Sequence, residues 1–487
     1  MKSNWKAAVA LAAVGVASSA FAQNAATVIA NASKAMGVDG LNSITYYGSG
    51  ANYNLGQNNN ASYPWPRVNV NDYRRTIDFG TPASLATGVT FAVPVTGGPA
   101  APAPFTQNIT AANQAWAQQL EIWITPWGFL KGAATNNATV ARRTVDGERF
   151  NVVTWSSPIK SPGGAAYKLV GYVDSDNLVT KVETWLENPI FGDMLVETSY
   201  GDYRDNNGLK YPTAIVQKRG GWPTFEAQVL GVEKNPANLT ALLTPPAPPA
   251  GAGGPPPGGA PAAPPAASSE KLADGVFRIT GGYVALAVEL ADQIVLFEPA
   301  GQNEARAQAV FAEVKRVIPG KPIKYGIISH HHFDHTSGLA AVVAEGITIV
   351  THEANEKFFE DALAAPRTLA PDSMSKSGKK PVIETMTGKR VFTDGARTLE
   401  VHEIKGLPHA DGMLIGYLPN ENIVIFADMF NLPPAANPVP NPPVVGTQVF
   451  VANLERLGIR DAKIISVHAP NPDRPIAQRD ILASLGR

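Results

Sequence analysis

The most chemically suggestive part of this chain is a cluster of histidines in its second half. All eight histidines lie at or after position 330, and four of them fall in the six-residue run HHHFDH that begins there. Imidazole and carboxylate ligands suit a borderline cation such as Zn²⁺. A chance or solvated histidine run would carry no fixed aspartate and no matching distant ligands. The run, which directly follows the strand-like segment IKYGIIS, therefore predicts a metal site.

The spacing of this run is similar to a known family signature. The pattern His330-x-His332-x-Asp334-His335 after an apolar strand resembles the signature of the metallo-β-lactamase superfamily. The resemblance covers the chain from about position 273 to its end. Three further matches follow in the family's order, namely His409 in GLPHADG, Asp428 in VIFADMF and His468 in IISVHAP.

The resemblance implies a dinuclear metal centre, with two zinc ions expected and other divalent metals possible. The implied ligands of the first metal are His330, His332 and His409, those of the second are Asp334, His335 and His468, and Asp428 bridges the two. Two cations about 3.5 to 4 Å apart can share a water whose pKa falls toward neutrality, so a hydroxide forms without a protein base. Asp334 is expected to orient this hydroxide, which makes it the predicted catalytic residue.

The resemblance also narrows the branch of the family without fixing the substrate. Asp428 stands where the β-lactamases proper have a cysteine or no ligand, and this chain contains no cysteine at all. The acid favours the glyoxalase II, lactonase or phosphodiesterase-like branches. Ser337, Pro408 and Ala427 depart from the glycines or threonine that the family usually has beside its ligands, but no ligand is replaced.

We therefore interpret the chain as a metal-dependent hydrolase of an ester, lactone, amide or phosphoester bond in a small-molecule substrate. One alternative is a mono-iron sulfur oxygenase of the same fold, which keeps two histidines and one acid. His468 and the complete second ligand set argue against it. Another alternative is a non-catalytic, metal-stabilised envelope binding protein. A structural metal site is normally closed with four ligands, whereas seven leave room for solvent and substrate.

The three remaining histidines are expected to be structural. His331 and His352 lie at strand ends, and His402 lies in the alternating strand TLEVHEI. His331 is the one that could also line the pocket, because it neighbours ligands.

The predicted ligands lie among alternating strands and helices. Strand-like segments begin with VFRIT, VALAVEL and QIVLFEP and continue through ITIVTH, KRVFTD, MLIGYLP and NIVIFAD to KIISVHA. Helical patterns occur at 303–317, near 355–363 and near 448–457. Two sheets sandwiched by helices are the natural closure of such a chain. The resemblance implies the same architecture, the four-layer αββα sandwich of the metallo-β-lactamase fold.

A proline-, glycine- and alanine-rich segment divides the chain into two predicted domains. Residues 244–269 read TPPAPPAGAGGPPPGGAPAAPPAASS, a composition that neither nucleates a helix nor buries a core. We interpret it as a linker between an N-terminal domain, residues 23–243, and a C-terminal domain, residues 270–487. A proline-rich recognition ligand is the alternative interpretation.

The N-terminal domain is predicted to be mainly antiparallel β. After a helix at 25–36, residues 167–234 alternate apolar and polar side chains between turn-forming segments. This succession resembles the curved sheet of periplasmic lipoprotein carriers without showing a catalytic motif, so its protein partner is open. Residues 54–104, rich in Asn, Gly, Pro and Ala, are predicted to form long loops, with the aromatic cluster at 63–66 packed locally.

The N-terminus predicts export. Lys2 and Lys6 precede a short apolar run, and Ala20-Phe21-Ala22 forms a small-residue cleavage pattern, so residues 1–22 are predicted to be a signal peptide. The apolar run is shorter than the roughly 18 residues of a membrane span. A periplasmic or secreted protein without a transmembrane segment after cleavage is therefore expected.

The charge balance argues against nucleic acid as a partner. The chain has 40 Lys+Arg and 41 Asp+Glu, which provides no basic footprint for a phosphate backbone.

Overall fold

The computed structural model describes residues 24–92, 101–112, 115–247, 266–432, 443–470 and 473–487. The predicted signal peptide, residues 1–22, and most of the predicted linker, residues 244–269, lie outside these ranges. Strand β12 begins at Ser268, inside the predicted linker, because Ser268 pairs with Thr280 of the next strand.

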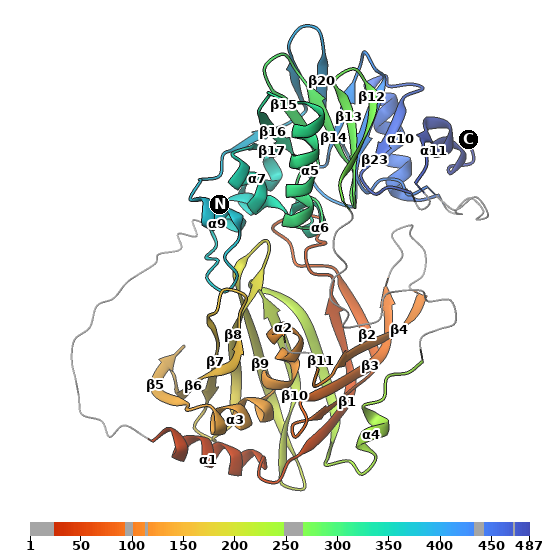
Figure 1. The fold of residues 1–487 in the computed structure, drawn as a ribbon. Helices are drawn as coiled ribbons and strands as arrows, with labels where there is room; N and C mark the ends of the chain where they lie inside the picture. The colour runs from red at the N-terminus through yellow and green to blue at the C-terminus, as the bar shows by residue number, and fades with distance from the viewer. Residues whose placement is uncertain (1–23, 93–100, 113–114, 248–265, 433–442, 471–472) are drawn as a thin grey trace.

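The N-terminal half is one antiparallel sheet of eleven strands in the order β4-β3-β2-β1-β11-β10-β9-β8-β7-β6-β5 (Figure 1). Strand β1, the first in the sequence, thus pairs with β11, the last strand of the sheet in the sequence. The strands are β1 (Ser43–Tyr53), β2 (Arg67–Asp78), β3 (Ala83–Ala92), β4 (Ala101–Ile109), β5 (Thr139–Val145), β6 (Glu148–Lys160), β7 (Ala166–Val173), β8 (Val179–Asn188), β9 (Gly192–Asn206), β10 (Leu209–Arg219) and β11 (Trp222–Lys234). This sheet confirms the predicted antiparallel architecture.

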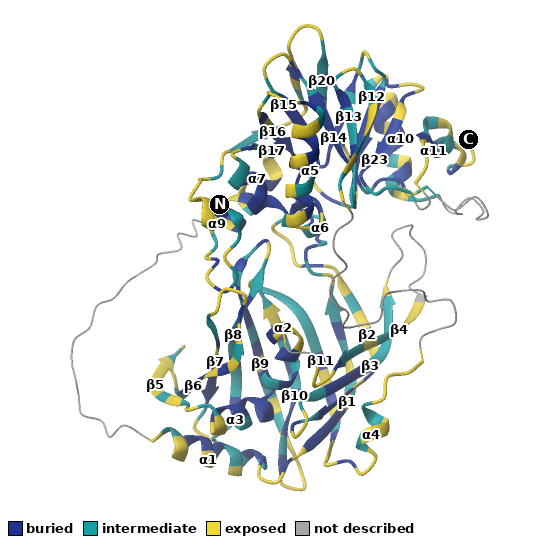
Figure 2. Ribbon diagram, in the orientation of Figure 1, coloured by how far each residue is buried: buried dark blue, intermediate teal, exposed yellow. Residues whose placement is uncertain are grey.

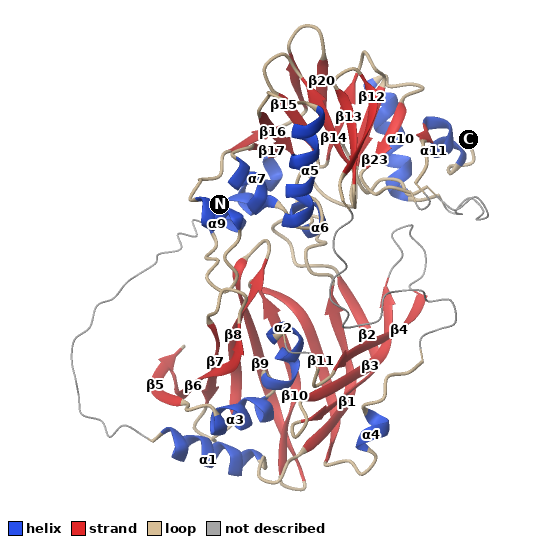
Figure 3. Ribbon diagram, in the orientation of Figure 1, coloured by secondary structure: helices blue, strands red, loops and turns tan. Residues whose placement is uncertain are grey.

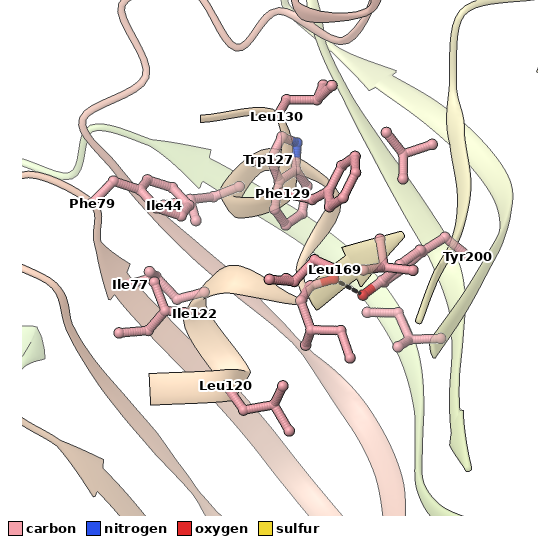
Figure 4. Close-up of a cluster of buried hydrophobic side chains, with 14 of the residues drawn as sticks. Ile44, Ile77, Phe79, Leu120, Ile122, Trp127, Phe129, Leu130, Leu169 and Tyr200 are labelled. Carbon is pink, nitrogen blue, oxygen red and sulfur yellow. Dashed lines mark hydrogen bonds between the residues drawn. The ribbon is translucent and has the colours of Figure 1, made fainter. Parts of the chain in front are cut away.

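Short helices pack against this sheet, and the first three of them bury side chains in its core. They are α1 (Ala25–Met36), α2 (Trp116–Trp123), α3 (Pro126–Thr135) and the single turn α4 (Leu239–Leu242). Helix α3 begins where it does because Thr125 accepts a hydrogen bond from the Gly128 amide and Pro126 occupies the first turn. Figure 4 shows Leu120, Trp127 and neighbouring side chains converging on the strands.

The prediction of long loops over residues 54–104 is wrong for most of its length. Strands β2 and β3 and the start of β4 occupy this segment. Its polar residues obscured the strand pattern, because some of them are buried and paired rather than solvated. Arg75 is only 4% exposed and donates hydrogen bonds to Tyr73 and Ser84. Pairing with neighbouring strands outweighs the weak intrinsic β propensity of the segment.

The C-terminal half contains two mixed sheets. The first has seven strands in sequence order, β12 (Ser268–Ala273), β13 (Val276–Thr280), β14 (Ala285–Glu289), β15 (Ile294–Phe297), β16 (Ile323–Ile327), β17 (Thr348–His352) and β18 (Ile383–Met386). The second has six, β19 (Lys389–Thr393), β20 (Thr398–Glu403), β21 (Leu414–Leu418), β22 (Ile423–Phe426), β23 (Lys463–Ser466) and β24 (Ile476–Ala477). Figure 3 shows how strands and helices alternate here, in contrast to the N-terminal half.

Helices cover the outer faces of both sheets. One buried cluster joins the two sheets, a second packs the first sheet against its helices, and a third packs the second sheet against its helices. The strands of both sheets are largely buried (Figure 2). The helices are α5 (Glu304–Val317), α6 (Phe333–Thr336), α7 (Leu339–Glu345), α8 (Glu356–Ala364), α9 (Ser373–Ser377), α10 (Val445–Leu457) and α11 (Gln478–Ala483), with a 3₁₀ turn at Glu353–Asn355. The predicted αββα sandwich is confirmed, and α5, α8 and α10 correspond to the three predicted helices.

The two halves meet through hydrogen-bonded loops. The hairpin between β8 and β9 contacts residues 366–369, where Asp193 accepts hydrogen bonds from the Thr368 and Leu369 amides. Arg367 donates to the Ile190 carbonyl. The loop between β1 and β2 contacts the edge of the sandwich beside α6 (Figure 1). Over the described residues, every helix is too short or too polar to cross a membrane.

Candidate metal centre

All seven predicted ligands lie at one edge of the sandwich, in segments that follow strands. The HHHFDH segment follows β16 and enters α6, and His409 lies between β20 and β21. Asp428 and His468 follow the adjacent parallel strands β22 and β23. The structure divides the seven residues into two groups, each with ligand atoms within 4.8 Å of one another. We name them the imidazole group (His330, His332 and His409) and the carboxylate group (Asp334, His335, Asp428 and His468).

In the imidazole group, the rings of His330 and His332 each use one nitrogen in a hydrogen bond and leave the other nitrogen available. His330 Nδ1 lies 2.9 Å from Ser329 Oγ, and its buried Nε2 has no hydrogen-bond partner. His332 Nε2 lies 2.9 Å from the Asn58 carbonyl oxygen, so it donates there and leaves Nδ1 available. His409 Nε2 is buried and unpartnered as well. Such outer hydrogen bonds fix the orientation of a metal-ligating ring.

The imidazole group is neutral at physiological pH. Burial lowers the pKa of His330 well below its ordinary value and that of His332 to about 3. Burial also lowers the pKa of His409. Because a metal binds the neutral imidazole, these rings are ready to coordinate a cation without first releasing protons.

The carboxylate group is a compact set of charged contacts. His335 Nε2 lies 2.9 Å from Asp428 Oδ2 and 3.3 Å from Asp334 Oδ2. His468 Nε2 lies 2.9 Å from Asp428 Oδ1. Although burial opposes it, the charges of Glu298 and Asp428 raise the pKa of His335 well above its ordinary value. A proton on His335 therefore partly balances the negative charge of these acids.

Asp428 faces both groups. Its Oδ2 lies 3.6 Å from His330 Nε2 and 3.9 Å from His409 Nε2. The same oxygen approaches His335 Nε2 without the alignment of a hydrogen bond, and it is buried and unpartnered. Unpartnered buried polar atoms are rare in folded proteins, and three of them converge here on one point. The residues present therefore fit metal binding, and Asp428 faces both groups of candidate ligands.

Two supporting residues within the sandwich were missed by the sequence analysis. Glu298 is fully buried directly after β15, accepts a hydrogen bond from the Ser329 amide and contacts His335 Nδ1 at 2.9 Å. Tyr283 donates to Asp334 Oδ2 at 2.9 Å, and its ring centroid lies 4.3 Å from that of His468. The signal for Glu298 was an acid placed directly after an apolar strand, in QIVLFEP.

Two further supporting residues come from the N-terminal half. Gln57 Nε2 donates to Asp334 Oδ1 at 2.8 Å, and the Asn58 carbonyl contacts His331 and His332. Nothing in the local sequence of this loop indicates metal chemistry.

The remaining histidines take part in neither group. His331 is fully buried and bonds to the Asn58 carbonyl rather than facing the cluster of ligand atoms. His352 Nδ1 accepts a hydrogen bond from the Ala354 amide, and His402 pairs with Glu400 at 2.8 Å. These contacts agree with the structural roles expected for all three.

Comparison with protein families identifies the class of the C-terminal half. Residues 281–466 match the model of the metallo-β-lactamase superfamily. The C-terminal half of this chain belongs to that superfamily and has its fold. The match does not extend to the N-terminal sheet, whose resemblance to lipoprotein carriers stays a prediction.

Individual relatives are distant. The chain is 28% identical over 172 residues to the 2,4-dinitroanisole O-demethylase subunit alpha of a Nocardioides species, a match that spans 35% of this chain and 46% of that relative. Among solved structures, a metallo-β-lactamase from Pontibacter korlensis is 17% identical, with 45% of this chain and 97% of that one covered and a TM-score of 0.33. A metallo-β-lactamase from Hirschia baltica is 18% identical, with 45% and 96% covered and the same TM-score.

Proposed function

We propose that this protein is an exported metal-dependent hydrolase that uses two divalent cations, zinc being the first candidate, to cleave an ester, lactone, amide or phosphoester bond in a small molecule. The observation that carries the proposal is the convergence of His330 Nε2, His409 Nε2 and Asp428 Oδ2, which are buried and have no hydrogen-bond partner. Nitrogen and oxygen donors without thiolates suit zinc and similar divalent ions. When bound, such cations activate water and polarise the substrate oxygen.

The residues of the chain contribute positioning. Asp334 is the most exposed member of the two groups, with 34% of its side chain accessible, whereas His330 and His335 are fully buried. Substrate therefore has access from the side of Asp334 and His468. Gln57 and Tyr283 hold the two oxygens of Asp334 from opposite halves of the chain. A carboxylate fixed in this way can orient the attacking water, which is the catalytic role proposed for Asp334.

The arrangement favours this proposal over the two alternatives. A mono-iron sulfur oxygenase binds its iron with two histidines and one acid and does not need His335 and His468 as ligands. Here both residues contact Asp428 at 2.9 Å. A purely structural site is closed, whereas Asp334, His468 and His409 keep part of their side chains accessible.

A substrate panel combined with metal analysis tests the proposal. The panel holds a lactone, a thioester, a β-lactam and a phosphodiester. The name of the Nocardioides relative suggests a fifth compound, 2,4-dinitroanisole. We expect two metal equivalents per chain and hydrolysis of one class, abolished by a chelator and restored by zinc. A metal-replete protein with one ion only, and with His335 and His468 uncoordinated, would contradict the dinuclear site.

Export is tested separately. The N-terminal sequence of protein recovered from the periplasm or the medium should begin at Gln23. Protein found only inside the cell, with its first 22 residues retained, would contradict this part of the proposal.

A further inference from the structure

The loop between β1 and β2 brings five consecutive residues of the N-terminal half against the metal centre. We name residues 56–60 the clamp. Its first part contacts the HHHFDH segment. The Phe333 amide donates to the Gly56 carbonyl at 3.2 Å, and Gln57 donates to Asp334. The Asn58 carbonyl accepts from His332. Three successive clamp residues thus bond to the segment that carries four of the seven predicted ligands.

The second part of the clamp contacts the loop that carries His409. Asn59 donates its side-chain amide to the Pro408 carbonyl at 2.9 Å and accepts from the Asp411 amide at 2.7 Å. Asn60 donates to the Asp411 carboxylate at 2.7 Å. The clamp therefore bonds on one side to the HHHFDH segment and on the other to the residues flanking His409. These two segments together supply all three members of the imidazole group.

The close approach of the clamp depends on a glycine. Gly56 has a φ of +75°, and a Cβ added there would lie 2.2 Å from Cγ of Phe333. A side chain at this position would both strain the backbone and collide with the ring. Beside it, Trp65 is 3% exposed and packs edge-on against Phe333 at 6.3 Å between ring centroids. Packing as well as hydrogen bonding holds the clamp in place.

We infer that the clamp is a positioning element of the metal centre, so that the sheet domain sets the geometry of ligands carried by the other half. Gln57 fixes the carboxylate of Asp334, and the Asn58 carbonyl fixes the ring of His332. The inference rests on the proposed function in one respect, namely that these residues bind metal. It goes beyond that function by assigning the N-terminal half a part in it.

Gln57→Met in the full-length chain tests the inference. Methionine keeps the length of the side chain and removes the donor. The matched control is Gln308→Met on α5, where an exposed glutamine bonds only locally to Glu304. The metal-free proteins are titrated with Co²⁺, with the visible spectrum recorded, and the affinity of each site is measured by chelator competition. Removing a residue that hydrogen-bonds to a metal ligand typically lowers metal affinity by about 10- to 100-fold.

We expect Gln57→Met to weaken binding at the carboxylate group by about that factor and to shift its Co²⁺ spectrum. The control should match the wild type, and the melting temperatures of all three metal-free proteins should agree. Two metals bound equally well by Gln57→Met and the control, with the same spectra, overturn the inference alone. A wild type that binds no metal overturns the proposed function and the inference that rests on it.

Gly56→Ala tests the clamp independently of metal. The added methyl group should push the clamp away, which exposes the Phe333 and Asp411 amides that it protects. Hydrogen exchange at these two amides should accelerate, and Co²⁺ binding should weaken at both groups because both ligand segments lose their support. Unchanged exchange at Phe333 and Asp411 in a folded Gly56→Ala protein would overturn the clamp.

Discussion

The two groups of candidate ligands differ in their charge and in the residues that support them. The imidazole group is uncharged, and its two buried rings, His330 and His332, are held by the neutral Ser329 hydroxyl and Asn58 carbonyl. The carboxylate group carries two acids, and the further acid Glu298 lies behind it. Its own positive charge comes from His335, whose pKa the neighbouring carboxylates raise. The first group is therefore prepared to accept a cation as it stands, whereas a cation entering the second competes with a proton.

The largest expected effect comes from removing the residue that the two groups share. Asp428→Ala should lose the second metal before the first, because it leaves His335 and His468 without the acid that they both contact. Loss of this shared acid should weaken binding at the carboxylate group by more than the about 10- to 100-fold that loss of a supporting partner causes. Elemental analysis should find one metal per chain. Asp361→Ala, in an exposed pair on α8, is the control.

Should Asp428→Ala retain two metals with ordinary affinity, Asp428 does not link the groups. The contrast between them would then lose its central residue.

A smaller effect is expected at the exposed edge of the carboxylate group. Asp334→Asn keeps the shape of the side chain and removes its charge, so the loss should fall mainly on kcat, on the order of 10². Steady-state kinetics with metal content determined for the same samples make the measurement. Asp361→Asn provides a matched change away from the site. Near-normal kcat with two metals bound would remove Asp334 from its catalytic role.

Glu298→Gln tests whether the metal affinity of the two groups depends differently on pH. Because Glu298 raises the pKa of His335, the proton on that ring must be displaced by an entering metal, and the affinity of the carboxylate group should rise with pH. In Glu298→Gln this rise should be shallower, because the proton on His335 competes less. The affinity at neutral pH should still be about 10- to 100-fold weaker, because the ring loses the acid that orients it and raises its basicity. The imidazole group should bind as before. Chelator competition at several pH values measures both sites.

An equally steep pH dependence in Glu298→Gln would show that the proton is not held by this acid. Loss of affinity at both groups together would mean that Glu298 supports the fold rather than one metal.

The sequence brought forward the residues that the structure gathers into two candidate metal-binding groups, because metal binding restricts both residue type and position. Only a few side chains bind such metals, and the HHHFDH segment, Asp428 and His468 each follow an apolar strand that the sequence pattern indicates. Glu298 follows the same rule and was recoverable in principle. The strands β2 and β3 were not, because a buried and paired residue such as Arg75 looks like a loop residue when its partners are unknown.

The clamp lay beyond prediction for a different reason. Gln57 and Asp334 are 277 residues apart in the sequence, and their contact depends on how two separately patterned halves dock. The asparagines and glycine around Gln57 are typical of any surface loop, whether or not it contacts a candidate metal ligand. Composition therefore predicted a loop correctly at residues 54–66 but did not predict which residues the loop contacts.

The smallest expected effect concerns His331, which is buried beside the imidazole group without belonging to it. Burial lowers its pKa to about 4, below the value of about 6.5 expected in the unfolded chain. The unfolded state therefore takes up the proton first, so the stability that the neutral ring contributes is present above about pH 6.5 and is lost as the pH falls toward 4. In metal-free His331→Gln, which has no titrating group there, the melting temperature should fall less steeply between pH 6.5 and 4. The difference should be a few degrees, since His330 and His332 are also neutral and buried and still titrate in the variant. His402→Gln is the comparison, because burial lowers the pKa of that ring too but its hydrogen bond with Glu400 opposes the shift. If His331→Gln and the wild type lose stability with the same slope, the acid sensitivity belongs to the ligands, and the distinction between His331 and its neighbours fails.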